Sequence, residues 1–279
     1  IGRAQPKLDR LHKLYLDDIE SVRVGLSKPN AAAPAGFGLK PDELTDEKLD
    51  ELAARVESAY KNLKITLSLE ESANDCDYYI ESMAEIPEDK HVFYRNLNEI
   101  LEDKTIVMTN SSTLLPSTFK VDFTKPERYL ALHFANNIWR SNSAEVMGHD
   151  GTSQAAYDEA VEFAKALHMV PIKVLKEQPG YLLNSMLVPF LNSAQYLLAN
   201  GIGDHENIDM AWKIGTGAPY GPFQILDIVG LTTAYNIVAN HPEANDPTTN
   251  AGKIAAMLKK YIDAGKTGVN AGEGFYKYR

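Results

Sequence analysis

Three polar residues follow short apolar runs, where the core of a folded protein should end, and a fourth lies within such a run. Asn110 and Ser112 follow the run TIVM, His133 follows YLAL, and Glu145 lies within the apolar segment AEVM. Short runs of this kind are typical of strands buried on both faces of a parallel sheet. Because ligands bind outside the carboxyl ends of such strands, we expect a hydroxyl, an imidazole and a carboxylate to converge at one edge.

These residue types suit proton transfer to or from a ligand. A histidine titrates near neutral pH, and a carboxylate beside it orients the ring and stabilises its cationic form, a role that fits His133 with Glu145. None of these side chains can supply or accept a hydride, so a reaction that transfers one would require a redox cofactor. Two other interpretations are an ordinary packed His–Glu pair and a hydrolase, although the G-x-S-x-G turn of many hydrolases is absent around Ser112.

Over most of its length the chain resembles the L-3-hydroxyacyl-CoA dehydrogenase family. The resemblance rests on NSST at Ser112, ALHF at His133, AEVM at Glu145, PGYLLNSMLVP at Asn184, and the C-terminal segments GAPYGPFQILDIVGL and GEGFYKY. It implies that Ser112, His133, Glu145 and Asn184 surround the substrate, with His133 and Glu145 as the acid-base pair.

The resemblance also implies a cofactor, a substrate and an assembly. It implies NAD as the cofactor, with Glu85, Lys90, Asn110 and Ser112 at the nicotinamide end. It further implies an acyl-CoA substrate, interconverted between its (S)-3-hydroxyacyl and 3-oxoacyl forms, and a homodimer formed through the C-terminal helices. Two alternatives remain open: a related hydroxyacid dehydrogenase of the gulonate type, and a non-enzymatic relative similar to the lens crystallins.

The chain departs from the family pattern beside the histidine. The family usually continues His-Phe-Phe-Asn-Pro, whereas this chain reads His133, Phe134, Ala135, Asn136, Asn137. We therefore expect an altered pocket wall at this point, and the preferred acyl length does not follow from the sequence.

The apolar periodicity predicts an α/β fold, with an incomplete Rossmann-like, mostly parallel and doubly wound sheet followed by an all-α domain. Helices are predicted over residues 4–20, from Thr45 or Asp46 through Leu63, and over 88–101 and 152–168. Strands are predicted at ITLSL, CDYYIESM, TIVM, YLAL and VPIKVL. Glu81 and Glu85 are expected at the solvated exit of CDYYIESM.

The segment KEQPG marks the predicted domain boundary. Residues 1–177 are expected to form the dinucleotide-binding domain, and residues 178–279 a helical domain for substrate binding and dimerisation. The helix predicted from Tyr181 to Asn200 is apolar nearly all round, which predicts burial on every side, either at the centre of the domain or at a subunit interface.

The glycine fingerprint of a dinucleotide-binding sheet is missing from this sequence. Neither AGFG near Gly36 nor GIGDHE near Gly203 stands between a strand and a helix of a βαβ unit. We expect the first βαβ unit to lie upstream of Ile1. A polypeptide that starts at Ile1 is then expected to bind NADH weakly and to expose an unpaired sheet edge.

The composition excludes several classes of protein. A net charge of −10, without clusters of Lys and Arg, argues against nucleic-acid binding. No apolar run has the length of a membrane-spanning helix and no signal peptide is present, so we expect a cytoplasmic protein. The single cysteine, Cys76, cannot form an internal disulfide. Because no spacing of His, Cys and carboxylates resembles a metal site, no metal is predicted.

Overall fold

The computed structural model describes residues 4–26, 44–136, 138 and 141–278 of this protein. The chain divides into two compact units, Ile1–Tyr181 and Leu182–Arg279, which we call unit 1 and unit 2. Gly36 and Asn137, both singled out in the sequence, lie outside the described residues. None of the described helices is both long and apolar enough to cross a membrane.

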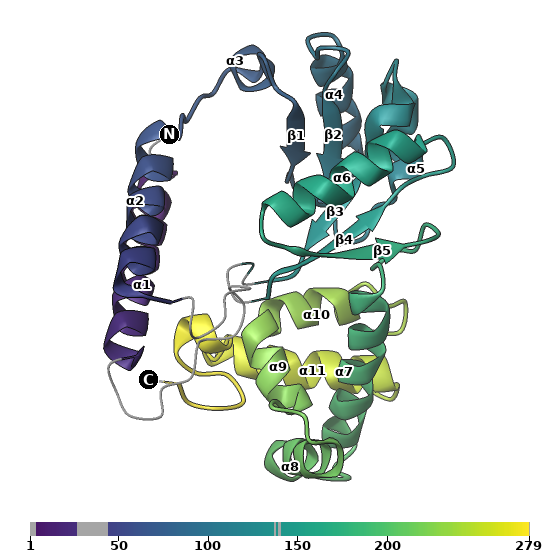
Figure 1. The fold of residues 1–279 in the computed structure, drawn as a ribbon. Helices are drawn as coiled ribbons and strands as arrows, with labels where there is room; N and C mark the ends of the chain where they lie inside the picture. The colour runs from purple at the N-terminus through teal and green to yellow at the C-terminus, as the bar shows by residue number, and fades with distance from the viewer. Residues whose placement is uncertain (1–3, 27–43, 137, 139–140, 279) are drawn as a thin grey trace. The chain divides into compact units, whose positions relative to one another are not determined.

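Unit 1 is built on a sheet with the strand order β1-β2-β3-β4-β5 (Figure 1). Its strands are β1 (Tyr78–Glu81), β2 (Ile106–Thr109), β3 (Tyr129–Phe134), β4 (Ser143–Met147) and β5 (Val170–Val174). All neighbouring strands are parallel except β3 and β4, which pair in antiparallel fashion. The prediction of a mostly parallel Rossmann-like sheet is therefore confirmed.

Helices cover both faces of this sheet. Leu130 and Leu132 of β3 pack with Ala160 and Ala164 of α6 (Gln154–Ala166) on one face. On the other face, Tyr129 packs with residues of α4 (Pro87–Asn98) and of the short helix α5 (Pro116–Phe119). Successive residues of a strand point to opposite faces, so a strand that is apolar throughout requires cover on both sides.

Within residues 4–26 and 44–77, three further helices precede the sheet: α1 (Gln5–Leu26), α2 (Asp46–Asn62) and α3 (Leu69–Ala73). Helices α1 and α2 pack against each other, with the ring of His12 stacked on Tyr60 at a centroid distance of 4.1 Å. The predicted helix start at Thr45 is confirmed, because its hydroxyl accepts a hydrogen bond from the backbone N–H of Lys48.

The strand predicted at ITLSL is wrong. Residues 63–68 have no helical or strand assignment, Leu67 is 84% exposed, and Leu69 already belongs to α3. The hydroxyl of Ser68 caps α3 by accepting a hydrogen bond from the N–H of Glu71. A helix cap with acidic residues in the first turn therefore outweighs the alternation of apolar residues.

Unit 2 consists of helices, which confirms the predicted all-α C-terminal part. They are α7 (Leu183–Ala199), α8 (His205–Thr216), α9 (Pro222–Val229), α10 (Leu231–Ala239), α11 (Asn250–Asp263) and a 3₁₀ turn at Val269–Ala271. Met186 is 68% and Tyr196 41% exposed on the single chain, so a central position of α7 is wrong, and its burial at a subunit interface stays a prediction. The core of unit 2 covers only one side of this helix, through Leu191 and Ala194.

Candidate active site

His133 and Glu145 face each other across the antiparallel pair of strands β3 and β4. The register places them directly opposite, and His133 Nδ1 lies 3.0 Å from a carboxylate oxygen of Glu145. Both side chains are almost fully buried, with exposed fractions of 5% and 2%. A buried carboxylate at this distance fixes the orientation of the ring and favours a proton on Nδ1.

Ser112 completes a chain of three polar groups. Its hydroxyl oxygen lies 3.2 Å from the other ring nitrogen of His133, Nε2. Ser112 follows β2 and is half-buried, whereas His133 lies near the end of β3. We call Ser112, His133 and Glu145 the triad; the sheet brings together three residues that the sequence had singled out.

Glu85 holds the turn that carries Ser112. Its carboxylate accepts hydrogen bonds from the hydroxyl of Ser111 at 2.7 Å, the backbone N–H of Ser112 at 3.2 Å and the hydroxyl of Thr113 at 2.8 Å. Ser111 and Thr113 are site residues that the sequence did not predict. Their signal was the run of hydroxyl residues NSST directly behind a buried strand, where only one of the two serines received a role.

Asn110 links β2 to β3 at the same end of the sheet. Its side-chain oxygen accepts a hydrogen bond of 3.0 Å from the backbone N–H of Phe134, and its amide nitrogen lies 3.4 Å from the hydroxyl of Ser82. Asn110 is half-buried and Glu85 is exposed, so both present polar atoms outside the carboxyl ends of β1 and β2.

Lys90 and Glu81 depart from what the sequence predicts. Glu81, expected at a solvated strand exit, is 2% exposed, and Lys90 has no exposed surface. The Lys90 ammonium donates to both carboxylate oxygens of Glu81, at 2.7 and 2.8 Å. The contact of Lys90 with the nicotinamide stays a prediction. A buried ammonium needs a charged partner, and Glu81 at the end of β1 provides it.

The Glu81 carboxylate has further donors besides Lys90. The hydroxyls of Tyr94 and Thr109 and the N–H of Met83 all donate to it. Burial alone would raise the pKa of Glu81, but the hydrogen bonds from Lys90, Tyr94, Met83 and Thr109 together hold this pKa below its usual value. Glu81 therefore stays ionised and anchors the start of the turn that leads to Glu85.

Asn184, the fourth residue expected around the substrate, belongs to unit 2. It lies in the first turn of α7 and is half-buried. The geometry of unit 1 does not test its role.

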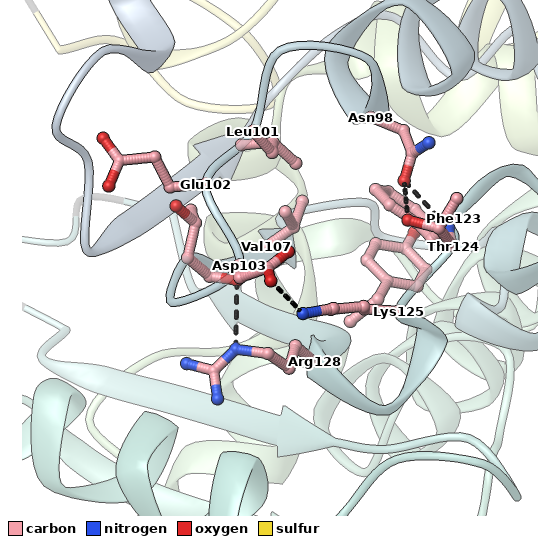
Figure 2. A pocket seen from close by; sticks show the side chains of 11 residues that line it. Asn98, Leu101, Glu102, Asp103, Val107, Phe123, Thr124, Lys125 and Arg128 are labelled. Carbon is pink, nitrogen blue, oxygen red and sulfur yellow. Dashed lines mark hydrogen bonds and ion pairs between the residues drawn. The ribbon is translucent and has the colours of Figure 1, made fainter.

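A small cavity lies at the opposite end of the sheet from the triad. It is lined by residues at the start of β2 and β3, among them Val107 and Tyr129, and has a volume of about 30 Å³ (Figure 2). The Lys125 ammonium and the Asp103 carboxylate pair across its wall at 2.6 Å. A volume of this size holds about one water molecule, so the cavity is too small for an organic substrate.

The triad can hold and move a proton. His133 can take up a proton at Nε2 while Glu145 stabilises the resulting cation through Nδ1. Among the described residues, no group of three or more His, Cys, Asp or Glu side chains is arranged to hold a metal ion.

Comparison with known proteins identifies the family. Residues 39–178 match the NAD binding domain of 3-hydroxyacyl-CoA dehydrogenase, and residues 180–278 match its C-terminal domain. The chain belongs to the 3-hydroxyacyl-CoA dehydrogenase family. Unit 1 accordingly contains the family's domain for NAD, the cofactor that the sequence resemblance implies.

Individual relatives agree with this family. The mitochondrial hydroxyacyl-coenzyme A dehydrogenase of Homo sapiens is 32% identical over 85% of this chain and 72% of its own length. The structure of (S)-3-hydroxybutyryl-CoA dehydrogenase PaaH1 from Ralstonia eutropha superimposes with a TM-score of 0.66 at 25% identity, over 85% of this chain and 81% of that one. A diketoreductase, described as acting on dicarbonyl compounds, gives a TM-score of 0.81 at 40% identity, over 99% of this chain and 86% of that one.

Proposed function

We propose that this protein is an NAD-dependent oxidoreductase that interconverts (S)-3-hydroxyacyl-CoA and 3-oxoacyl-CoA, with His133 and Glu145 as its acid-base pair. The observation that carries the proposal is the triad, in which each ring nitrogen of His133 has one polar partner, 3.2 Å away at Ser112 and 3.0 Å at Glu145. Membership of the 3-hydroxyacyl-CoA dehydrogenase family supports the substrate class.

Each side chain has its own role in the proposed reaction. In the oxidation direction, Nε2 of His133 accepts the proton of the substrate hydroxyl, and Glu145 stabilises the imidazolium through Nδ1. Ser112 and Asn184 donate hydrogen bonds to the substrate oxygens, and Glu85 keeps Ser112 in place through the backbone N–H. Bound NAD supplies the acceptor for the hydride, which no side chain can provide.

The residues at the carboxyl ends of β1 and β2 fit the nicotinamide end of the cofactor. Glu85 is exposed there, and Asn110 and Ser112 are half-buried, so all three have polar atoms within reach of a ligand. Lys90, the fourth residue expected there, lies behind them and is buried against Glu81. The described residues contain no βαβ unit that opens with the G-x-G-x-x-G turn for a pyrophosphate.

A spectrophotometric assay tests the proposal. The native full-length protein is mixed with NADH and acetoacetyl-CoA, and the absorbance of NADH is followed. We expect NADH oxidation that depends on acetoacetyl-CoA, together with a strong loss of rate in His133→Gln. Absence of turnover with acetoacetyl-CoA, while a hydroxyacid of the gulonate type is oxidised when NAD+ replaces NADH, would assign the protein to the other class of dehydrogenase. No turnover with any hydroxy or oxo acid would favour the non-enzymatic alternative.

A second candidate function is the reduction of dicarbonyl compounds without coenzyme A. It is favoured by the 40% identity to the diketoreductase and by Ala135 and Asn137, which stand in the sequence where the family usually has Phe and Pro. The same assay separates the two candidates when acetoacetyl-CoA is compared with a β-diketone that lacks the CoA group. A higher kcat/KM for the diketone would favour the second candidate, and a higher value for acetoacetyl-CoA the first.

We also propose that the protein forms a homodimer through unit 2. The apolar side chains Met186 and Tyr196 of α7 are exposed on the single chain. A groove of about 510 Å³ lies between α7, α10 and α11, with Leu197, Ile237 and Ile254 in its wall. Exposed apolar surface of this kind is typical of protein interfaces. Sedimentation equilibrium at micromolar concentration tests this proposal, and a stable monomer would contradict it.

A further inference from the structure

The ring of Tyr181 lies flat against the imidazole of His133. The two ring centroids are 4.4 Å apart and the ring planes differ by 10°. The edges of the same imidazole are engaged by Glu145 at Nδ1 and by Ser112 near Nε2. The aromatic face therefore limits tilting of the imidazole out of its plane, a motion that two in-plane partners restrain weakly.

Tyr181 is itself firmly held. Its side chain is 1% exposed and packs with Ala131, Met147 and Val174. Its hydroxyl donates a hydrogen bond of 2.8 Å to the backbone carbonyl of Ser111, the residue before Ser112. One side chain thus contacts both the imidazole and the turn that carries the triad serine.

The backbone of Tyr181 adopts an unusual conformation. Its φ angle is +54°, in the left-handed region that bulky residues rarely adopt. Such conformations persist where the surrounding structure enforces them, and they cluster at functional sites. Gly180, directly before it, also has a positive φ of +79°, so the turn that follows Pro179 directs the ring of Tyr181 onto His133.

We propose that Tyr181 is a positioning residue, which holds the imidazole of His133 in line between Ser112 and Glu145. The proposal rests on the acid-base role that we propose for His133. The ring carries the effect by covering the imidazole face, and the hydroxyl ties that ring to the Ser112 turn. When His133 takes up a proton, its positive charge lies over the face of an aromatic ring, an arrangement that is itself attractive.

The hydroxyl of Tyr181 remains a donor at all working pH values. Burial raises its pKa well above the usual value of 10.0, and the nearby carboxylates of Glu85, Glu145, Glu81 and Glu177 raise it further. The bond to the carbonyl of Ser111 is therefore kept throughout the range in which the enzyme is assayed.

Four variants test the role of the ring. Tyr181→Phe keeps the ring and loses the hydroxyl, whereas Tyr181→Leu and Tyr181→Met remove the ring. Val174→Ala is the matched control, because Val174 packs in the same cluster and is 3% exposed. We expect kcat to fall about 10- to 100-fold in the Leu and Met variants and by less than about threefold in the Phe and Val174 variants, with KM changed little in all four. Equal kcat values in Tyr181→Leu, Tyr181→Met and Val174→Ala would overturn the proposal.

A spectroscopic measurement keeps the test independent of the substrate. The ring protons of His133 are assigned by NMR, from the signals that disappear in His133→Gln. In the wild type and in Tyr181→Phe we expect them to be shifted upfield by the stacked ring, and in the Leu and Met variants we expect this shift to be lost. Unchanged His133 signals in the Leu or Met variant would contradict the stacking. Absence of turnover in the wild type would instead contradict the proposed function, and the NMR result would still decide the position of the ring.

Discussion

Both units of this protein bury carboxylates, but they surround them differently. In unit 1, Glu145 meets a titratable imidazole, and the neighbouring Glu85 is exposed and binds the hydroxyls of a turn. In unit 2, Asp209 and Asp227 are 3% and 1% exposed, and backbone N–H groups are their main donors. The partner of the carboxylate is a side chain that can itself take up a proton in the first arrangement, whereas in the second the main partners are backbone N–H groups, which cannot.

Asp209 and Asp227 account for the residue pattern of the two C-terminal motifs. Asp209, on α8, accepts hydrogen bonds from the N–H groups of Phe223 and Gln224 in the first turn of α9. Asp227, on α9, accepts from the N–H groups of Phe275 and Tyr276. The segments GAPYGPFQILD and GEGFYKY thus contribute to the family resemblance through architecture. Within unit 1 the resemblance comes from residues that can take part in chemistry.

The largest expected effect separates activity from stability. In His133→Gln we expect kcat to fall about 10²- to 10⁴-fold, because the general acid-base group is lost. The amide of Gln can still donate a hydrogen bond to Glu145, so the melting temperature should stay close to that of the wild type. Steady-state NADH oxidation and differential scanning calorimetry measure the two quantities. A loss of less than about tenfold would remove His133 from the proposed role.

The second prediction concerns a substitution in unit 2 that lowers the stability of the protein. Asp227→Asn leaves an amide NH₂ facing the N–H of Tyr276 or the hydroxyl of Tyr278, which both donate to one oxygen of Asp227 at 2.9 Å. We expect the free energy of unfolding to fall by about 2–4 kcal/mol, since buried donors lose their acceptor. Urea denaturation measures this change.

A surface carboxylate provides the control for Asp227. Asp263 pairs with Lys259 at 2.6 Å, and both side chains are more than half exposed. Asp263→Asn should change the free energy of unfolding by less than about 0.5 kcal/mol, because exposed ion pairs contribute little. Similar losses in the two Asn variants would mean that burial is not what makes Asp227 important.

The third prediction concerns glycines that let the backbone approach these carboxylates. A Cβ on Gly221 would lie 2.2 Å from Cγ of Asp209, so Gly221→Ala must displace a buried side chain. We expect a loss of about 1–3 kcal/mol in the free energy of unfolding. Gly215, inside α8, has no atom within 4 Å of such a Cβ. Gly215→Ala should therefore stabilise the protein by about 0.5–1 kcal/mol, and the opposite signs in thermal unfolding test the packing.

The smallest expected effect is a difference in pH dependence between the units. The pKa of Glu81 is lowered on folding, because four hydrogen-bond donors outweigh its burial, so its stabilising contribution is present above its unfolded value near 4.5 and is lost as the pH falls through the folded pKa. Burial raises the pKa of Asp227, so its contribution is present below the unfolded value near 3.8 and is lost as the pH rises through the folded pKa.

Melting temperatures at pH 3 and pH 7 test these opposite signs. The difference between the wild type and Glu81→Gln should widen from pH 3 to pH 7, whereas the difference between the wild type and Asp227→Asn should narrow. If both differences in melting temperature widen, or both narrow, one of the two pKa directions is wrong.

Local signals in the sequence determined most of the secondary structure and the residues of the triad. Apolar runs such as TIVM and YLAL are long enough only for buried strands, and their polar ends pointed to Ser112 and His133. The antiparallel step between β3 and β4 could not be predicted, since a short apolar run does not reveal the direction of its partner. That step places Glu145 directly opposite His133.

Tertiary structure alone decided which polar residues are exposed and which are buried partners. From the sequence, Glu81 is expected at a solvated strand end and Lys90 at the nicotinamide, yet strand β1 and helix α4 bring them together where neither could be buried alone. Tyr181 carried no signal beyond the Pro-Gly before it, and its contact with His133 joins residues far apart in the chain. The sequence by itself determined the groups that can do chemistry, because their types are local; which of them meet depends on the pairing of distant segments, because burial and orientation are properties of the folded chain.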